Sequence, residues 1–447
     1  MKRILVIPLL LALFTQGYGQ TQAWSLEECM RYAVENSPRT AIQKAQNDIH
    51  KQNYQQAIAS LLPSITGQVG ASYNFGRALG DDNTYKAVNT FDNTYQLYAS
   101  FTLFDGMSSV NRVKLEKVNR LSGRHKLQAE EDMVAYETME AFFNALYYKQ
   151  TVALAQERLE ESSANLHQTE RMAELGLKGA PDVAEMRAQE AADRYKLTQQ
   201  KNMLAIGLIL LKERMNFPVD GELDIAEYDG DELLQSDDSD AFAIYEEALE
   251  SNPKAQAAEA EMEAGELSFK VTRGSLLPTL YMQGGVSTNY FKYRDGSDQM
   301  SFSDQFKDKR GEYFGFTMSI PIFDGLSRRS AKNVSRYRME IARYEYENTL
   351  RELYSEIEQA VADVRGQADE YTQAERQVEA MDVAHDMNRR KYEQGLLSAL
   401  ELHTSANRLL AARTQLRNAR LRYLLKHRLL EYYKGQPFLP EESVSEE

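Results

Sequence analysis

The sequence predicts a fold of α-helices and transmembrane β-strands, built from two structural repeats that each hold long coiled-coil helices and one β-hairpin. The first observation is a repeated motif: Leu-Phe-Asp-Gly ends at Gly106, and Ile-Phe-Asp-Gly ends at Gly325, 219 residues later. Gly-Leu turns at Gly176 and Gly395 have the same separation. The second observation is a change of hydrophobic period from helical to alternating before each motif. The third is a long segment without proline after each motif, which as a helix would extend about 100 Å.

Composition excludes several classes of function. The 447 residues carry a formal net charge of −15, which argues against nucleic acid as a partner because phosphate binding requires a basic surface. A single cysteine, Cys29, permits no internal disulfide and excludes a site made of several thiolates. The six histidines are scattered, and no Gly-x-Ser-x-Gly motif occurs. We therefore predict that the chain is no enzyme and holds no catalytic residue, metal or cofactor.

The N-terminus has the layout of a secretory signal peptide. Lys2 and Arg3 precede the apolar run 4–14, and small residues follow at Gly17 and Gly19. We expect residues 1–19 to be cleaved from the mature protein. No other stretch is long and apolar enough to span a membrane as a helix, so entry into a membrane would require β-structure.

The first repeat, expected at residues 20–216, begins with two helices. Residues 24–34 are amphipathic, with Ser25 as the N-cap and Glu28 three residues later to complete a capping box. A second helix, from about residue 39, is expected to end just before Pro63, because the residue preceding a proline disfavours helical angles.

Two β-hairpins are expected, at residues 64–104 and 279–322. Apolar or small residues alternate with polar ones between Ile65 and Phe75, and an Asp- and Asn-rich loop separates them from a similar run at 95–103. Each strand has about 10 residues or slightly more, with one apolar and one polar face, as in transmembrane strands. A hairpin packed on a soluble core would show the same alternation and is the alternative.

Long helices follow each hairpin, from Gly106 to Arg171 and, in the second copy, down to Arg390. Their apolar residues recur at spacings of three and four. Helices of this length need partners to bury such stripes, so coiled-coil packing is implied. Asp105 and Asp324 are candidate N-caps.

Each long helix then turns back, near residues 176–181 and 395–400. The returning helices begin at Asp182 and Glu401, where an acid is favoured by the helix dipole. Residues 217–241 form an acidic connector, solvated or a small appended element, before the second repeat at 242–435. The tail 436–447 is acidic and expected to be mobile.

Four strands cannot close a barrel, and an open sheet edge cannot lie in lipid because its amides would lack hydrogen-bond partners. Two copies would supply eight strands, which enclose an interior filled by side chains, whereas a hollow pore needs more. We therefore predict a homotrimer in which four strands per chain form a twelve-stranded barrel, continued by an α-helical tube.

The chain resembles the outer-membrane efflux protein family, the TolC-like exit ducts, over essentially its whole mature length. The shared features are duplicated and regularly spaced: the Leu-Leu-Pro before each hairpin, the Phe-Asp-Gly after it, and the Gly-containing turns. The resemblance implies a trimer whose barrel lies in outer-membrane lipid of a Gram-negative bacterium and whose tube crosses the periplasm. It also implies contact with a periplasmic adaptor protein and, through it, an inner-membrane pump.

The resemblance places a periplasmic tip at the helical turns, where the family closes the resting tube and contacts the adaptor. By motif position the tip comprises Gly176, Leu177, Asp182, Tyr392, Gly395, Leu396, Ser398 and Glu401. The hairpin–helix junctions are Pro63, Phe104, Asp105, Gly106, Pro278, Phe323, Asp324 and Gly325. Three positions depart from the family pattern: Glu401 replaces the usual Asp, Thr404 replaces a second acid, and Leu397 stands where some members carry Arg. For Asp182 and Glu401, a simple capping role is the alternative to gating.

The function implied is an exit duct of a tripartite efflux or type I secretion system, passively conducting small molecules or secreted polypeptide. A periplasmic coiled-coil scaffold without a pore is the alternative from another class. A pore should partition into the outer membrane and conduct ions, whereas a scaffold should be soluble without detergent.

Overall fold

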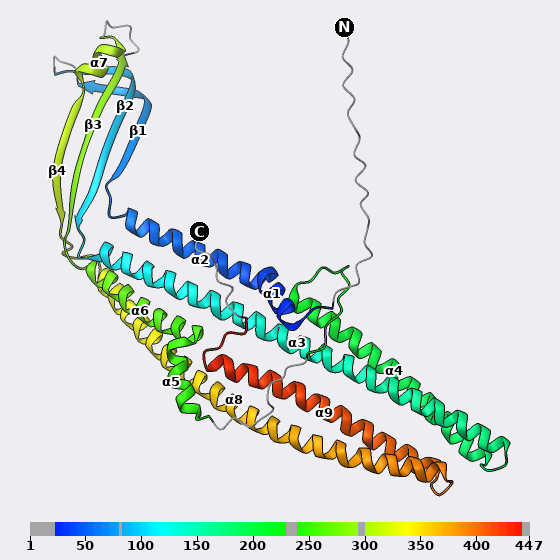
Figure 1. The fold of residues 1–447 in the computed structure, drawn as a ribbon. Helices are drawn as coiled ribbons and strands as arrows, with labels where there is room; N and C mark the ends of the chain where they lie inside the picture. The colour runs from blue at the N-terminus through cyan, green and yellow to red at the C-terminus, as the bar shows by residue number, and fades with distance from the viewer. Residues whose placement is uncertain (1–22, 80–82, 229–238, 294–299, 440–447) are drawn as a thin grey trace, which may run out of the picture. The chain divides into compact units, whose positions relative to one another are not determined.

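A computed structural model describes residues 23–79, 83–228, 239–293 and 300–439 (Figure 1). The expected signal peptide and the last residues of the acidic tail lie outside these ranges. The helices and strands described are α1 (Leu26–Asn36), α2 (Pro38–Ala59), β1 (Ser64–Leu79), β2 (Tyr85–Phe104), α3 (Ser108–Glu174), α4 (Ala180–Met215), α5 (Ala241–Ser251), α6 (Pro253–Gly274), β3 (Thr279–Tyr293), α7 (Phe302–Asp308), β4 (Gly311–Ser319), α8 (Ser327–Glu393) and α9 (Ala399–Tyr433).

The predicted repeat is confirmed element by element. The helices α1 and α5 have 11 residues each, α2 and α6 have 22 each, and α3 and α8 have 67 each. The returning helices α4 and α9 have 36 and 35 residues. The capping box predicted at the start of α1 is present, with the Ser25 and Glu28 side chains each accepting from the other's backbone N–H.

The strands are longer than predicted. The strand β1 has 16 residues and β2 has 20, so the Asp- and Asn-rich stretch expected to be a loop is largely the start of β2. Its polar residues pair across the ladder: Asn74 donates its side-chain amide to the Asp92 carboxylate at 2.5 Å. In the second hairpin, β4 has only nine residues and ends at Ser319, before Pro321, which has no N–H for the ladder.

A short helix that the sequence analysis missed, α7, explains why β4 is short. Gln305 in α7 is 2% exposed, and its side-chain amide pairs with both the N–H and the C=O of Phe291 in β3, at 3.2 and 3.1 Å. The ring of Phe306 packs edge-on against Tyr95 of β2. The helix α7 thus lies beside the C-terminal part of β3, around Phe291, where a neighbouring strand would otherwise pair.

The chain divides into two compact units that each draw on both repeats. One, the sheet unit, comprises Ala41–Glu130 and Asp240–Glu358. It contains the four-stranded antiparallel sheet β1-β2-β3-β4, with β1 and β4 at its edges, and the helices and helix segments that adjoin it. Val118, Ala260 and Leu267 form a small core between α3 and α6.

The other unit comprises the described residues of Met1–Thr40, Glu131–Ser239 and Gln359–Glu447. We call it the hairpin unit, after the helical hairpins α3–α4 and α8–α9 whose turns it contains. Its core includes Phe142, Leu146, Leu211 and Leu424, each fully buried. The acidic connector is packed in its described part, because Ile225 is buried and pairs with Trp24 in a parallel bridge. The connector's residues 229–238 lie outside the description. None of the helices in the described part of the chain combines the length and apolar character needed to cross a lipid bilayer.

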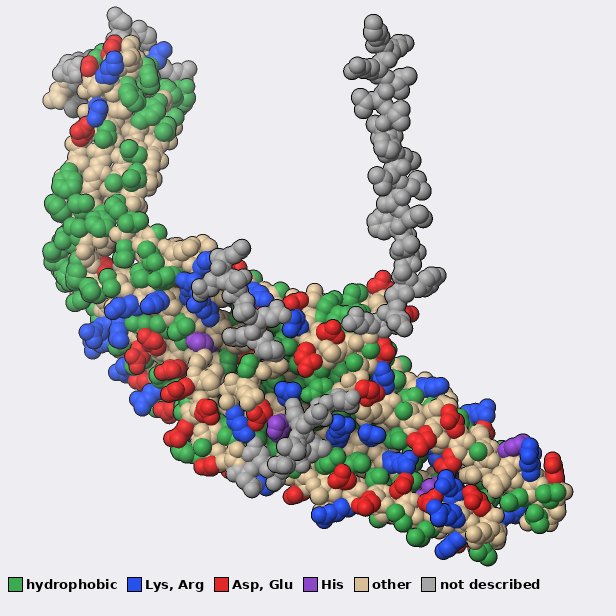
Figure 2. All heavy atoms as spheres, in the orientation of Figure 1, with side chains coloured by type: hydrophobic (Ala, Val, Ile, Leu, Met, Phe, Trp, Pro, Cys, Tyr) green, Lys and Arg blue, Asp and Glu red, His purple; other side chains and the backbone are tan. Residues whose placement is uncertain are grey.

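The predicted alternation gives the sheet two chemically distinct faces. Residues directly opposite one another across the ladders share a face, so Ile65, Ala99, Gly284 and Phe314 form one row. On that face the large apolar side chains are exposed rather than covered: Ile65, Val69, Tyr73, Phe75, Leu97, Phe314, Phe316 and Met318. The other face carries polar side chains, among them Thr66, Gln68, Gln96, Ser100, Gln283 and Thr317, together with the rings of Tyr98, Tyr281 and Tyr313. Figure 2 shows hydrophobic side chains on the sheet and charged ones mainly on the helices.

Candidate functional site

The two helical turns, at the ends of α3 and α8, have the same backbone geometry. Gly176 and Gly395 both have φ of +75°, a left-handed conformation that only glycine adopts without strain. After α3, the N–H of Gly176 donates to the C=O of Ala173 and that of Leu177 to Met172. After α8, Gly395 donates to Tyr392 and Leu396 to Lys391 in the same pattern. Both are Schellman motifs, which satisfy the last carbonyls of each helix.

The acids predicted at the start of the returning helices cap those helices. Glu401 accepts from the Ser398 N–H at 3.0 Å and from its hydroxyl at 2.7 Å, while Ser398 accepts from the Glu401 N–H. These hydrogen bonds to Ser398 lower the pKa of Glu401. In the other turn, Asp182 accepts from the Gly179 N–H at 3.1 Å. Because Gly179 has no side chain, that capping box is only half formed.

We expect Ser398→Ala to destabilise the start of α9 by about 1 kcal/mol, because the N–H and the carboxylate of Glu401 both lose the Ser398 hydroxyl as a partner. Hydrogen exchange of the Glu401 amide, which donates to the Ser398 hydroxyl, should accelerate correspondingly. Gly179→Ser should have the opposite sign and slow exchange at the start of α4 by adding the missing hydroxyl. Unchanged exchange in both variants would contradict the capping role.

The turns expose leucine side chains. Leu177 is 70% exposed and Leu396 is 72% exposed, and Leu175 and Leu400 also face solvent. Burying such side chains against another surface stabilises a contact by roughly 1.5–3 kcal/mol each. The two turns therefore expose apolar side chains in a setting otherwise rich in charge.

Tyr392, assigned to the tip by motif position, is in contrast 1% exposed. Its hydroxyl shares a 2.6 Å hydrogen bond with Thr169 of α3, and the Lys178 ammonium lies 4.7 Å from its ring centroid. Met186, Ala399 and Leu402 complete an apolar cluster around it. Tyr392 thus ties the α3–α4 hairpin to the α8–α9 hairpin, and its side chain is covered within the chain itself.

Further from the turns, a buried network of charged groups joins α3, α4, α8 and α9, and sequence reasoning missed it. Arg158 is 6% exposed and lies 2.8 Å from Glu161 and 3.4 Å from the buried Asp193. Glu161 also meets His385 Nε2 at 2.9 Å, and His385 Nδ1 lies 3.3 Å from the Ser405 hydroxyl. These residues look like ordinary helical charges in the sequence, because only the packing of four helices brings them together.

The network predicts an acid transition. Burial alone would raise the pKa of Glu161, but hydrogen bonding to His385 and the charge of Arg158 outweigh it and lower the pKa from 4.5 to about 2. Because the folded pKa lies below the unfolded one, this stabilisation is complete above pH 4.5 and is lost as pH falls towards 2.

Glu161→Gln should therefore lower stability at neutral pH by on the order of 2 kcal/mol and should flatten the loss of stability on acidification. Thermal midpoints measured from neutral to acidic pH would show this. The exposed neighbour changed as Glu160→Gln is the matched control and should keep the wild-type acid profile. An identical acid profile for Glu161→Gln and wild type would contradict the account.

The hairpin–helix junctions also repeat their geometry. Gly106 and Gly325 have φ of +70° and +67°, and each is followed by a non-glycine residue with positive φ. Asp105 and Asp324 lie before the helix starts rather than at the N-caps, yet each carboxylate accepts a first-turn N–H, from Ser109 at 2.8 Å and Arg328 at 3.1 Å. Pro63 and Pro278 end the preceding segments directly before β1 and β3, and Phe104 and Phe323 are exposed next to the glycines.

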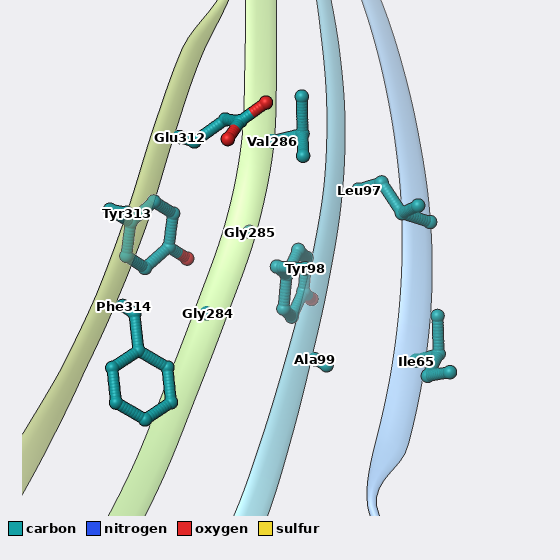
Figure 3. A pocket seen from close by; sticks show the side chains of 10 residues that line it. All are labelled: Ile65, Leu97, Tyr98, Ala99, Gly284, Gly285, Val286, Glu312, Tyr313 and Phe314. Carbon is teal, nitrogen blue, oxygen red and sulfur yellow. The ribbon is translucent and has the colours of Figure 1, made fainter.

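A hollow of about 520 Å³ lies in the sheet around two adjacent glycines (Figure 3). A Cβ on Gly285 would meet the Tyr313 ring at 2.9 Å, so the tyrosine covers this position. Gly285 thus makes room within β3 for the Tyr313 ring of the neighbouring strand.

Chemistry-bearing groups elsewhere are sparse. In the described ranges no three His, Cys, Asp or Glu side chains are arranged to hold a metal ion. Cys29 is buried, and burial raises the pKa of its thiol to about 12, which leaves it protonated at neutral pH.

Comparisons with known proteins agree with this architecture. Residues 244–435 match the model of the family described as "Outer membrane efflux protein". The chain is 22% identical to "Outer membrane protein TolC" of Salmonella enteritidis, covering 97% of this chain and 86% of that protein. It is 20% identical to "Alkaline protease secretion protein AprF" of Pseudomonas aeruginosa, over 90% and 82%. Among solved structures, a CusC crystal structure matches with a TM-score of 0.79 at 18% identity, over 92% of each chain. The family resemblance and the predicted fold of two helical repeats with a small antiparallel sheet are thereby confirmed.

Proposed function

We propose that the chain belongs to the outer membrane efflux protein family, whose model matches residues 244–435, and that it is an outer-membrane exit duct for a pump in the inner membrane. The observation that carries the proposal is the sheet. Its apolar face is exposed along all four strands, and among the described residues each edge strand, β1 and β4, is paired along one edge only. A face of this kind suits contact with lipid, and edges of this kind need further strands.

Copies of the same chain supply those strands. With four strands per chain, three copies would make a closed barrel of twelve strands, lined by the Thr, Gln and Ser face. Eight strands from two copies would leave an interior filled by side chains. The Thr, Gln and Ser side chains of the other face, which suit contact with water, therefore favour the homotrimer.

The helical turns would be the end that receives cargo from the pump complex. The exposed Leu177 and Leu396 offer apolar contacts to a periplasmic adaptor protein, and Gly176 and Gly395 set the turns that present them. Asp182, Ser398 and Glu401 shape the same turns by capping the returning helices. Gating by Asp182 and Glu401 would show as altered conductance or cation preference after both are replaced by Ala.

Transport through the duct is passive, and the chain carries out no catalysis. The relatives' names differ in cargo: one is a protease secretion protein and another a "Cation efflux system protein". Specificity therefore belongs to the pump, and both efflux and protein secretion are compatible with this duct.

The test is reconstitution of the mature protein in a planar bilayer. A duct conducts ions in discrete steps and is recovered with outer membranes. A protein that stays soluble without detergent and conducts nothing would instead support the coiled-coil scaffold. Leu177→Asp combined with Leu396→Asp should leave conductance intact and reduce cross-linking to the adaptor.

A further inference from the structure

Both long helices begin with a concentration of positive charge in an otherwise acidic chain. Residues 108–126 of α3 hold six Lys or Arg and one Glu, and residues 327–343 of α8 hold the same numbers. Neither helix has an acid in its first turn. Cations in the first turn of a helix, such as Arg328 and Arg329 of α8, oppose the helix dipole, and like charges gathered on neighbouring turns repel one another, so the placement is unfavourable unless anions compensate it. Figure 2 shows Lys and Arg side chains gathered on the helices next to the sheet.

Most cations in the first turns have no such anion within the described chain. We define the basic band as Arg112, Lys114 and Lys117 of α3 with Arg328, Arg329 and Lys332 of α8. Arg328 pairs with Asp324 at 3.6 Å. For the other five, no carboxylate within the described residues lies at ion-pair distance. Further along the same helices, in contrast, Lys126, Arg336 and Arg343 all have acidic partners.

A strip of exposed apolar side chains directly precedes the basic band on both helices. Before α8, Ile322 is 93% exposed and Phe323 is 82% exposed, and Leu326 also faces solvent. Before and at the start of α3, Phe104, Met107 and Val110 are exposed in the same way. An apolar strip followed within one or two helical turns by cations matches the layers of a membrane surface: the apolar side chains suit the hydrocarbon, and the cations suit the lipid phosphates next to it.

The geometry of a helix directs the band towards the sheet. Side chains on an α-helix tilt towards its N-terminus, which here adjoins the strands. At a rise of 1.5 Å per residue, Arg329 and Lys332 lie about 3 and 8 Å from the first residue of α8 along its axis. Lys114 lies about 9 Å from the first residue of α3. The polar layer of a bilayer leaflet is about 5–8 Å thick. Lys114 and Lys117 also line a groove of about 420 Å³ between α3 and α6, whose other charged residues are Arg120, Arg124 and Glu263; four cations against one carboxylate leave it positive, with room for a headgroup.

We propose that the basic band binds the phosphate groups of anionic phospholipids in the membrane leaflet next to the helices, and thereby fixes the depth at which the sheet lies. The inference rests on the proposed function, because it requires the sheet to lie in a bilayer. The ligand is a lipid phosphate rather than a soluble anion, since the apolar strip beside the band is built for a lipid surface.

The test is native mass spectrometry of the full-length mature protein equilibrated with equal amounts of phosphatidylglycerol and phosphatidylcholine. The test variant carries Lys114→Gln, Lys117→Gln, Arg329→Gln and Lys332→Gln. The matched control removes four exposed cations of α4 instead, by Arg187→Gln, Arg194→Gln, Lys196→Gln and Lys201→Gln. We expect wild type and control to retain phosphatidylglycerol preferentially, and the test variant to lose at least about tenfold of that preference.

Equal lipid preference in the test variant and wild type would overturn the proposal, as would an equal loss in the control. Inorganic phosphate added at excess should leave the lipid bound; displacement by phosphate alone would identify a soluble-anion site instead and overturn the assignment to lipid. Conductance of wild type in the same lipids separates the two hypotheses. A conducting wild type without lipid preference refutes only the basic band, whereas a wild type that never inserts refutes the duct.

Discussion

Gly106→Ala is expected to prevent correct folding of the sheet unit, with a loss of stability of more than about 3 kcal/mol. Two effects combine at this position. The φ of +70° strains any residue with a Cβ, by about 1–2 kcal/mol. The added Cβ would also collide with the backbone oxygen of Gly274 at the end of α6 and lie 2.9 Å from the Leu277 Cβ. Backbone cannot rotate away as a flexible side chain can, so the β2–α3 junction or the end of α6 must move.

The second repeat supplies the control for this prediction. Gly325 has nearly the same φ, +67°, but a Cβ there meets nothing within 4 Å. Gly325→Ala should therefore show the conformational strain alone, about 1–2 kcal/mol. Gly274→Ala should resemble Gly106→Ala, because its Cβ would lie 2.6 Å from the Gly106 oxygen. The amount of heat-stable protein recovered in membranes measures all three, and equal losses for Gly106→Ala and Gly325→Ala would contradict the contact.

Arg158→Met is expected to cost about 3–5 kcal/mol in the hairpin unit, because it leaves the buried Asp193 without its cation. Asp193 is 8% exposed at its side chain and meets Arg158 at 3.4 Å. An uncompensated buried carboxylate is much more costly than the loss of the pair as a whole. The double variant Arg158→Met with Asp193→Leu should therefore be more stable than Arg158→Met alone.

The exposed pair Arg187–Glu170, in the same unit, is the control for this change. Its partners lie 2.8 Å apart, but the Arg187 side chain is 67% exposed, and exposed pairs contribute only about 0–1 kcal/mol. Arg187→Met should thus leave the unit nearly as stable as wild type. Urea-dependent proteolysis of the α3–α4 and α8–α9 hairpins reads out both variants. Similar susceptibility of Arg158→Met and Arg187→Met would show that the buried network does not stabilise the hairpins.

Features that depend on local chemistry could be predicted from the sequence. The repeat is visible because the same turn residues recur at constant spacing, and the structure places a turn with a left-handed glycine at both Gly176 and Gly395. Proline positions marked the starts of β1 and β3, and alternation revealed the two faces of the sheet. The capping box at Ser25 follows from two residues three positions apart.

Features that depend on tertiary packing were missed. The N-terminal half of β2 is rich in Asn and Asp, residues with a low propensity for β-strands, but pairing with β1 overrides that preference. The helix α7 has only seven residues, too few for a helical period to be recognised in the sequence, and the contacts of Gln305 hold it in place. The burial of Tyr392 and the Arg158–Asp193 pair arise from helices that meet only in the folded chain. The same holds for the contact between Gly106 and Gly274.

The central claim is that several copies of this chain complete one closed sheet around a hollow path. Native mass spectrometry of the detergent-solubilised protein, paired with single-channel recording of the same sample, tests it most directly. The account predicts a complex of three chains that conducts ions in uniform steps. A stable monomer, or an assembly of any size that never conducts, would contradict it.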